Sequence, residues 1–165
     1  MLSEADLAQV QDQLGRTPRG VLDIAARCAC GAPLVVATAP RLPDGTPFPT
    51  TYYLTHPELT AAISRLEADG YMRELNDRLA ADPEMAQAYL SAHHAYLADR
   101  AEFARAAGIA DPPEIEGISA GGMPTRVKCL HALAGHALAA GPGVNPVGDE
   151  VLHKIGFRPE VCCCH

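Results

Sequence analysis

The sequence contains no tryptophan and only three phenylalanines among its 165 residues. Hydrophobic residues make up 48% of the chain, but aromatic residues contribute only 5%. Alanine, leucine, valine and isoleucine must therefore fill most of the core, and such small side chains allow helices to pack closely. The length is close to the commonest size of one domain. We expect residues 1–165 to form a single domain, with residues 156–165 as a mobile tail.

Long apolar segments and a targeting signal are also missing. No run of apolar residues is long enough to cross a bilayer. The N-terminal segment Met1–Asp6 is acidic and lacks the apolar run of a signal peptide. We therefore expect a cytoplasmic protein with no membrane partner. Disulfides are rare in the cytosol. The six cysteines are expected to be free thiols that bind a metal, take part in catalysis or fill the core.

An excess of positive charge is missing too, because the formal net charge is −7. A chain of this charge repels phosphate backbones, which argues against general nucleic-acid binding. One local exception is Gly121-Gly122, followed by Arg126 and Lys128. Glycines ahead of a helix that starts at Pro124, with basic residues in its first turns, are typical of an anion site. The same pattern also fits an ordinary helix start with solvated basic side chains, and the P-loop spacing is absent.

Periodicity and turn signals predict three strands followed mostly by helices, which indicates an α+β fold. Ser3 is a candidate cap for the first helix, and Thr55 with Glu58 forms a candidate capping box for the second. We expect a small antiparallel sheet of about three strands packed by four to six helices, with the first two strands forming a hairpin. The expected strands are residues 21–28, 34–38 and 50–54, and the expected helices are residues 3–14, 55–70, 72–79, 83–107 and 124–140.

Several cysteines and histidines are candidate metal ligands. Cys28 and Cys30 flank one residue next to a glycine, although zinc motifs usually have two or more intervening residues. His56 lies at a helix start, where the helix dipole favours a neutral imidazole that can ligate a metal. In a regular helix, Cys129 and His131 point in nearly opposite directions, so they could share a metal only if the first turn is irregular. The terminal segment, residues 162–165 (Cys-Cys-Cys-His), is expected to supply at most one ligand.

Distinctive sequences occur along most of the chain: CACGAP at 28–33, RLPDGTPFPT at 41–50, YLTHP at 53–57, RLE at 65–67, GGMP at 121–124, VKCLH at 127–131 and NPVGD at 145–149. In these segments the chain resembles a bacterial family catalogued as domain of unknown function 501. The resemblance covers most of residues 15–150 and leaves the C-terminal tail uncovered. Because the family has no established activity, the resemblance implies no reaction.

The resemblance does imply a set of ligands. In the family, a Cys occupies the position of Cys28, Cys or His occupies that of His56, and Lys-Cys-Leu-His occupies 128–131. A position that accepts Cys or His is typical of a metal ligand. The predicted site is therefore Cys28, His56, Cys129 and His131, with His136 or Cys30 as the replacement if His131 does not take part.

Two main interpretations follow. The favoured one is a metal-bearing domain in which zinc is preferred because of its mixed Cys/His ligands, with an iron–sulfur cluster as the alternative. The other is a metal-free enzyme or binding module for a phosphate-containing ligand. It would use Gly121, Gly122, Arg126 and Lys128, with Cys129 or His131 as nucleophile or acid/base. A third interpretation is a protein partner bound through residues 83–107. The sequence does not decide whether the protein is an enzyme.

Overall fold

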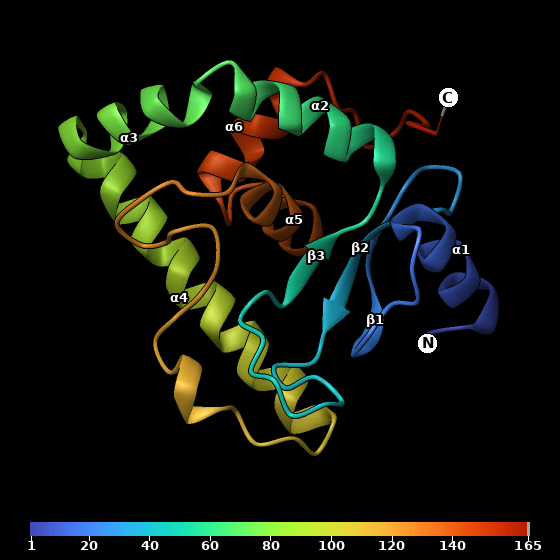
Figure 1. Cartoon of the computed structure of the whole chain (residues 1–165). Helices are drawn as coiled ribbons and strands as arrows, with labels where there is room; N and C mark the ends of the chain where they lie inside the picture. Colours follow the sequence, from blue (N-terminus) through green and yellow to red (C-terminus); the bar gives the residue numbers. More distant parts are fainter. Residues whose placement is uncertain (165) are drawn as a thin grey trace.

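A computed structural model describes residues 1–164 and shows one small sheet surrounded by helices (Figure 1). Over the described residues it confirms the α+β class with three strands and six α-helices. No helix in this part of the chain is both long enough and apolar enough to cross a membrane. The elements are α1 (Glu4–Leu14), β1 (Val21–Arg27), β2 (Pro33–Thr38), β3 (Tyr52–Leu54), α2 (Pro57–Ala68), α3 (Tyr71–Ala81), α4 (Pro83–Ala106), a short 3-10 turn (Pro113–Ile115), α5 (Leu130–Ala140) and α6 (Pro146–Lys154).

The sheet is antiparallel with the strand order β1-β2-β3. The β1–β2 hairpin was predicted from the sequence, and the structure confirms it. The central strand β2 is buried along its whole length, and it pairs with β3 through Val35 opposite Leu54. A strand buried on both faces has a continuous run of apolar residues in its sequence. Residues Leu34–Ala37 form such a run.

Helix α5 is the most buried helix and lies at the centre of the molecule, with α2, α4 and α6 around it (Figure 1). It packs on β3 and α6. Two glycines allow these close contacts. A Cβ atom at Gly135 would lie 3.1 Å from the Tyr52 carbonyl oxygen, and one at Gly148 of α6 would lie 2.1 Å from the Leu133 carbonyl oxygen. The absence of a side chain at these two positions thus permits the short distances between α5, β3 and α6.

The predicted caps were correct for α1 and wrong for α2. Ser3 and Asp6 form a reciprocal capping box at the start of α1. Helix α2, however, has His56 at its N-cap, without a side-chain capping bond. The Thr55 hydroxyl donates instead to Gln13 Oε1 at 2.7 Å. Thr55 is therefore used to join α2 to α1, and His56 is the residue at which the helix begins.

The predicted start of the last long helix at Pro124 is wrong, because α5 begins at Leu130. Gly121 and Gly122 have positive φ angles of 66° and 94°, and their carbonyl oxygens accept bonds from Lys128 N and Arg126 N. These contacts close a compact loop before the helix. Helix α6, which the sequence analysis did not predict, follows Asn145, whose side chain accepts a bond from Gly148 N.

Candidate metal centre

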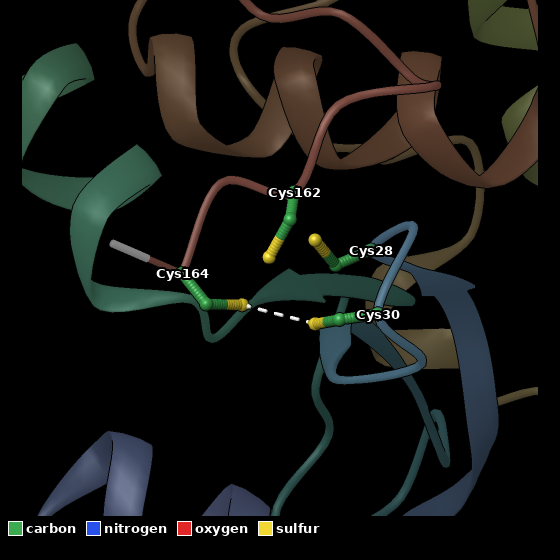
Figure 2. Close-up of side chains that lie close together, drawn as sticks. All are labelled: Cys28, Cys30, Cys162 and Cys164. Carbon is green, nitrogen blue, oxygen red and sulfur yellow. Dashed lines mark hydrogen bonds between the residues drawn. The ribbon is translucent and has the colours of Figure 1, made fainter.

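Sulfur atoms from two distant segments meet at one end of the sheet (Figure 2). Cys28 and Cys30 lie in the turn after β1, and Cys162 and Cys164 lie in the C-terminal segment. The Sγ atoms of these four cysteines all lie within 4.8 Å of one another. Both pairs have the spacing Cys-x-Cys, so each segment contributes two sulfurs separated by one residue.

The turn after β1 fixes the first pair. Cys28 N donates to Ala32 O, and Gly31 N donates to Cys28 O, both at 2.8 Å. Gly31 has a φ angle of 91°, a conformation that favours glycine. The turn buries Cys28, which is 5% exposed, and leaves Cys30 exposed. The Cys28 thiol therefore lies on the buried side of the centre, and the Cys30 thiol lies on its exposed side.

The C-terminal segment returns to this turn and supplies the second pair (Figure 1). Cys163 N donates to Cys28 Sγ at 3.3 Å, and the Cys163 thiol donates to the same sulfur at 3.5 Å. Cys164 Sγ lies 3.4 Å from Cys30 Sγ, between residues 134 positions apart in the sequence. The segment predicted to be a mobile tail thus lies against the turn after β1.

His56 adds a nitrogen donor to the same centre. Its side chain is buried, and Nε2 lies 3.3 Å from Cys164 Sγ and 3.9 Å from Cys163 Sγ. Its Nδ1 is buried without a hydrogen-bond partner among the described residues. Burial lowers the pKa of His56, so the imidazole is neutral at pH 7 and its Nε2 can face the sulfurs as a donor or a ligand.

The thiols differ in how readily they ionise. Burial opposes ionisation of Cys28, but hydrogen bonds from the Cys30 and Cys163 backbone and from their thiols outweigh it and lower its pKa to about 6. Burial and the nearby Cys28 sulfur raise the pKa of Cys163 to about 12. Burial and contacts with Cys30 and Cys28 raise the pKa of Cys164 as well. Cys28 therefore ionises readily, and its thiolate opposes ionisation of the neighbouring thiols.

A second group lies at the start of α5. Cys129 is the N-cap of that helix, and its Sγ, a nitrogen of His131 and a carboxylate oxygen of Glu67 lie within 4.8 Å of one another. Because the helix begins at Leu130, Cys129 is outside its regular part. The objection that a regular helix separates Cys129 from His131 therefore does not apply here.

The four predicted ligands thus fall into two groups. Cys28 and His56 meet through Cys163, whereas Cys129 and His131 meet beside Glu67. Of the two replacements considered for His131, Cys30 lies in the first group. His136 is fully buried in the core, bonded to Asn145 and packed on Tyr52 and Tyr96.

The predicted phosphate site depended on a helix that starts at Pro124, but α5 starts at Leu130. Adding a Cβ atom to Gly121 would place it 2.7 Å from Leu133 Cδ2, and adding one to Gly122 would place it 2.5 Å from Arg126 O. Close packing and positive φ angles therefore account for both glycines. Arg126 and Lys128 are exposed. At the true start of α5, Leu130 N donates to Glu67 Oε1 at 2.8 Å. The Glu67 carboxylate therefore already occupies the position at which this helix N-terminus would bind an anion.

Sequence reasoning missed Cys162 and Cys164 as joint members of the centre. The signal that could have identified them is the repeated Cys-x-Cys spacing at 28–30 and 162–164. Three adjacent cysteines at the end of a chain concealed that spacing.

The comparisons with known proteins give a family and no relative of known activity. The sequence model of the family described as "Protein of unknown function (DUF501)" matches residues 24–153. No curated protein and no solved structure matches the chain. The matched range includes Cys28, His56 and the Cys129 group, and it ends before Cys162.

Proposed function

We propose that this chain, which belongs to the DUF501 family of proteins of unknown function, holds one zinc ion through Cys28, Cys30, Cys162 and Cys164. The observation that carries the proposal is the convergence of these four Sγ atoms within 4.8 Å of one another. The ion would join the C-terminal segment to the turn after β1.

The spacing of the sulfurs suits a single ion. Zinc binds four thiolates tetrahedrally with Zn–S distances of about 2.3 Å, so the edge of the tetrahedron is about 3.8 Å. Cys30 Sγ and Cys164 Sγ are 3.4 Å apart, and no pair in the set exceeds 4.8 Å. In a [4Fe–4S] cluster each thiolate binds a different iron atom, which holds the sulfurs farther apart than one ion does. The geometry therefore favours one ion over such a cluster.

The surrounding hydrogen bonds support the same choice of ligands. Cys163 donates to Cys28 Sγ through both its backbone N–H and its thiol, and His56 Nε2 lies 3.3 Å from Cys164 Sγ. Donors of this kind orient metal-bound thiolates and reduce their negative charge. Cys163 and His56 are therefore assigned to the shell around the ligands.

The pKa values of the thiols favour a cation bound between them. Burial, together with contacts to the Cys28 sulfur, raises the pKa of Cys163 and Cys164, because desolvation and a nearby negative charge both oppose ionisation. A divalent ion removes this penalty and allows all four ligands to be ionised. Thiolates prefer zinc or another soft metal to magnesium or calcium. With four protein ligands the site has no open position, so its role is structural.

Metal content of single variants tests the proposal. Protein purified without chelators should carry one zinc per chain, whereas Cys30→Ser and Cys164→Ser should each lose it and melt at a lower temperature. The double variant should melt no lower than either single variant, because the first substitution already abolishes the site. Inductively coupled plasma mass spectrometry and thermal melting provide the two readouts.

Two control variants separate ligands from neighbours. Cys129→Ser removes a thiol outside the centre and should keep the zinc. Cys163→Ser removes only hydrogen bonds to Cys28 and should also keep it, with weaker affinity. A wild-type protein that neither contains zinc nor takes it up would contradict the proposal. Loss of zinc in Cys129→Ser together with retention in Cys30→Ser would contradict the ligand set.

A further inference from the structure

The group at the start of α5 is arranged as an activated cysteine. Glu67 comes from α2, whereas Cys129 and His131 flank the first residue of α5, and the three functional groups lie within 4.8 Å. Glu67 Oε1 lies 3.2 Å from His131 Nδ1 and accepts a bond from Leu130 N at 2.8 Å. The backbone bond holds the carboxylate, and the carboxylate in turn orients the imidazole.

Both nitrogens of His131 face hydrogen-bond acceptors. Nδ1 faces the Glu67 carboxylate, and Nε2 lies 3.2 Å from Thr60 O and 3.1 Å from Ser64 Oγ. A carboxylate and a carbonyl can only accept, so an imidazole that bonds to both carries a proton on each nitrogen and is an imidazolium. Neither nitrogen then has a lone pair for a metal. A cation at this place suits a thiolate at Cys129.

The helix start favours the thiolate for a second reason. Cys129 is at the N-cap of α5, where the helix dipole stabilises negative charge. Burial opposes ionisation, but the neighbouring His131 side chain and Ala132 backbone outweigh it and lower the pKa of Cys129. The neighbouring Cys129 sulfur in turn raises the pKa of His131. The titratable groups that face the thiol are His131 on α5 and Glu67 on α2.

Cys129 and His131 open onto a cavity of about 350 Å³, a size that accommodates a small ligand. The rest of its wall comes from β3 and the segment before it, from α2, from α5 and from the loop before α5, and it offers apolar groups and hydroxyls. No lysine or arginine lines it among the described residues, so an anionic phosphate ester would find no counter-charge. The lining residues other than Cys129 and His131 are Thr50, Tyr52, Tyr53, Leu54, Thr60, Gly121 and Ala132.

We propose that Cys129 is a nucleophile that accepts the acyl group of a neutral ester or thioester bound in this cavity. The thiolate attacks the carbonyl carbon, forming a C–S bond while the bond to the leaving alcohol or thiol breaks. The His131 imidazolium protonates the leaving group and becomes neutral. It then takes a proton from water, which attacks the acyl-cysteine, releases the carboxylic acid and restores the thiolate and imidazolium. Glu67 is a positioning residue.

Acylation of the full-length protein by p-nitrophenyl butyrate tests this assignment. We expect a burst of about one equivalent of p-nitrophenolate and a butyryl group on the tryptic peptide that begins at Cys129. Cys129→Ser and Cys129→Ala should lose both signals. His131→Gln should slow acylation about 30-fold at pH 7, because a thiol without a cationic partner is only a few per cent thiolate at that pH. The exposed His94→Gln should leave the rate unchanged. Glu67→Gln should move the alkaline limb of the pH–rate profile to lower pH, because the Glu67 carboxylate raises the pKa of His131.

Three results would overturn the proposal. The first is acylation of Cys129 in the wild type no faster than in a synthetic peptide of residues 125–135 under the same conditions. The second is a burst that persists in Cys129→Ser. The third is an acceleration on adding a chelator, which would show that a metal occupies the group and would exclude a free imidazolium. Because peptide mapping distinguishes Cys129 from the four zinc-site cysteines, failure here is separate from failure of the zinc proposal.

Discussion

At the scale of single residues, the fold gives chemically identical side chains different surroundings. The Cys28 sulfur is buried beneath hydrogen-bond donors, whereas Cys129 is at a helix N-terminus beside an imidazole. In the sequence, each of these cysteines follows a basic residue and precedes a small or apolar one. Their difference arises from hydrogen bonds made by residues distant in the chain, which is why the sequence analysis placed both in one metal site.

His136 leads to a prediction at this scale. Its side chain is fully buried between Tyr52 and Tyr96, and burial lowers its pKa from the ordinary value of 6.5 to about 4. Below pH 6.5 the unfolded chain therefore binds a proton that the folded chain does not. The free energy of unfolding should fall as the pH drops from 6.5 to 4, with at most about 3 kcal/mol from this residue.

Urea denaturation at several pH values measures the effect. His136→Gln lowers the stability at every pH, because its ring packing is lost, but it should flatten the dependence between pH 6.5 and 4. His94→Gln, at an exposed position, should leave the slope unchanged. An equally steep slope in wild type and His136→Gln would show that His136 does not carry the effect.

At the scale of elements, short-range signals predicted most strands and helices. The hairpin, the helix capped by Ser3 and the long helix after Asp82 were identified because turns and caps are local. The start of α5 was placed too early, since Pro124 resembles a first-turn proline. The true N-cap, Cys129, makes no side-chain capping bond, and Glu67 satisfies Leu130 N from another helix. No local pattern reveals such a contact.

The crossing of α5 and α6 leads to a prediction at this scale. A Cβ atom at Gly148 would lie 2.1 Å from Leu133 O and 2.8 Å from Ala137 Cβ, whereas one at Gly135 would be 3.1 Å from its nearest neighbour. Gly→Ala gains about 1 kcal/mol of helix propensity. At Gly148 the helices must separate, so Gly148→Ala should destabilise the protein by about 3 kcal/mol or more. Gly135→Ala should change stability by about 1 kcal/mol or less.

Chemical denaturation of the two variants makes the comparison. Because both glycines lie within helices, helix propensity acts in the same direction in each, and the difference between them reports packing. A Gly148→Ala protein as stable as the wild type would contradict the close crossing of α5 and α6.

At the scale of the whole molecule, the C-terminal segment meets the turn after β1, and the two segments together form the candidate metal centre. The contact between Cys30 and Cys164 spans 134 positions, and no periodicity or spacing rule indicates which distant segments meet. The family match ends at residue 153, so the resemblance did not include the second pair either. The α+β class could be predicted from the sequence, whereas the residues that lie beside Cys28 could be identified only from the fold.

X-ray absorption at the zinc edge, on protein purified without chelators, tests the central proposal most directly. Four sulfur ligands should give a single shell at about 2.3 Å, with no nitrogen or oxygen shell near 2.0–2.1 Å. Loss of the signal in Cys164→Ser and an unchanged spectrum in Cys129→Ser would match the assigned ligands. A first shell of mixed sulfur and nitrogen that changes in Cys129→Ser, or the absence of any zinc signal, would contradict the four-cysteine site.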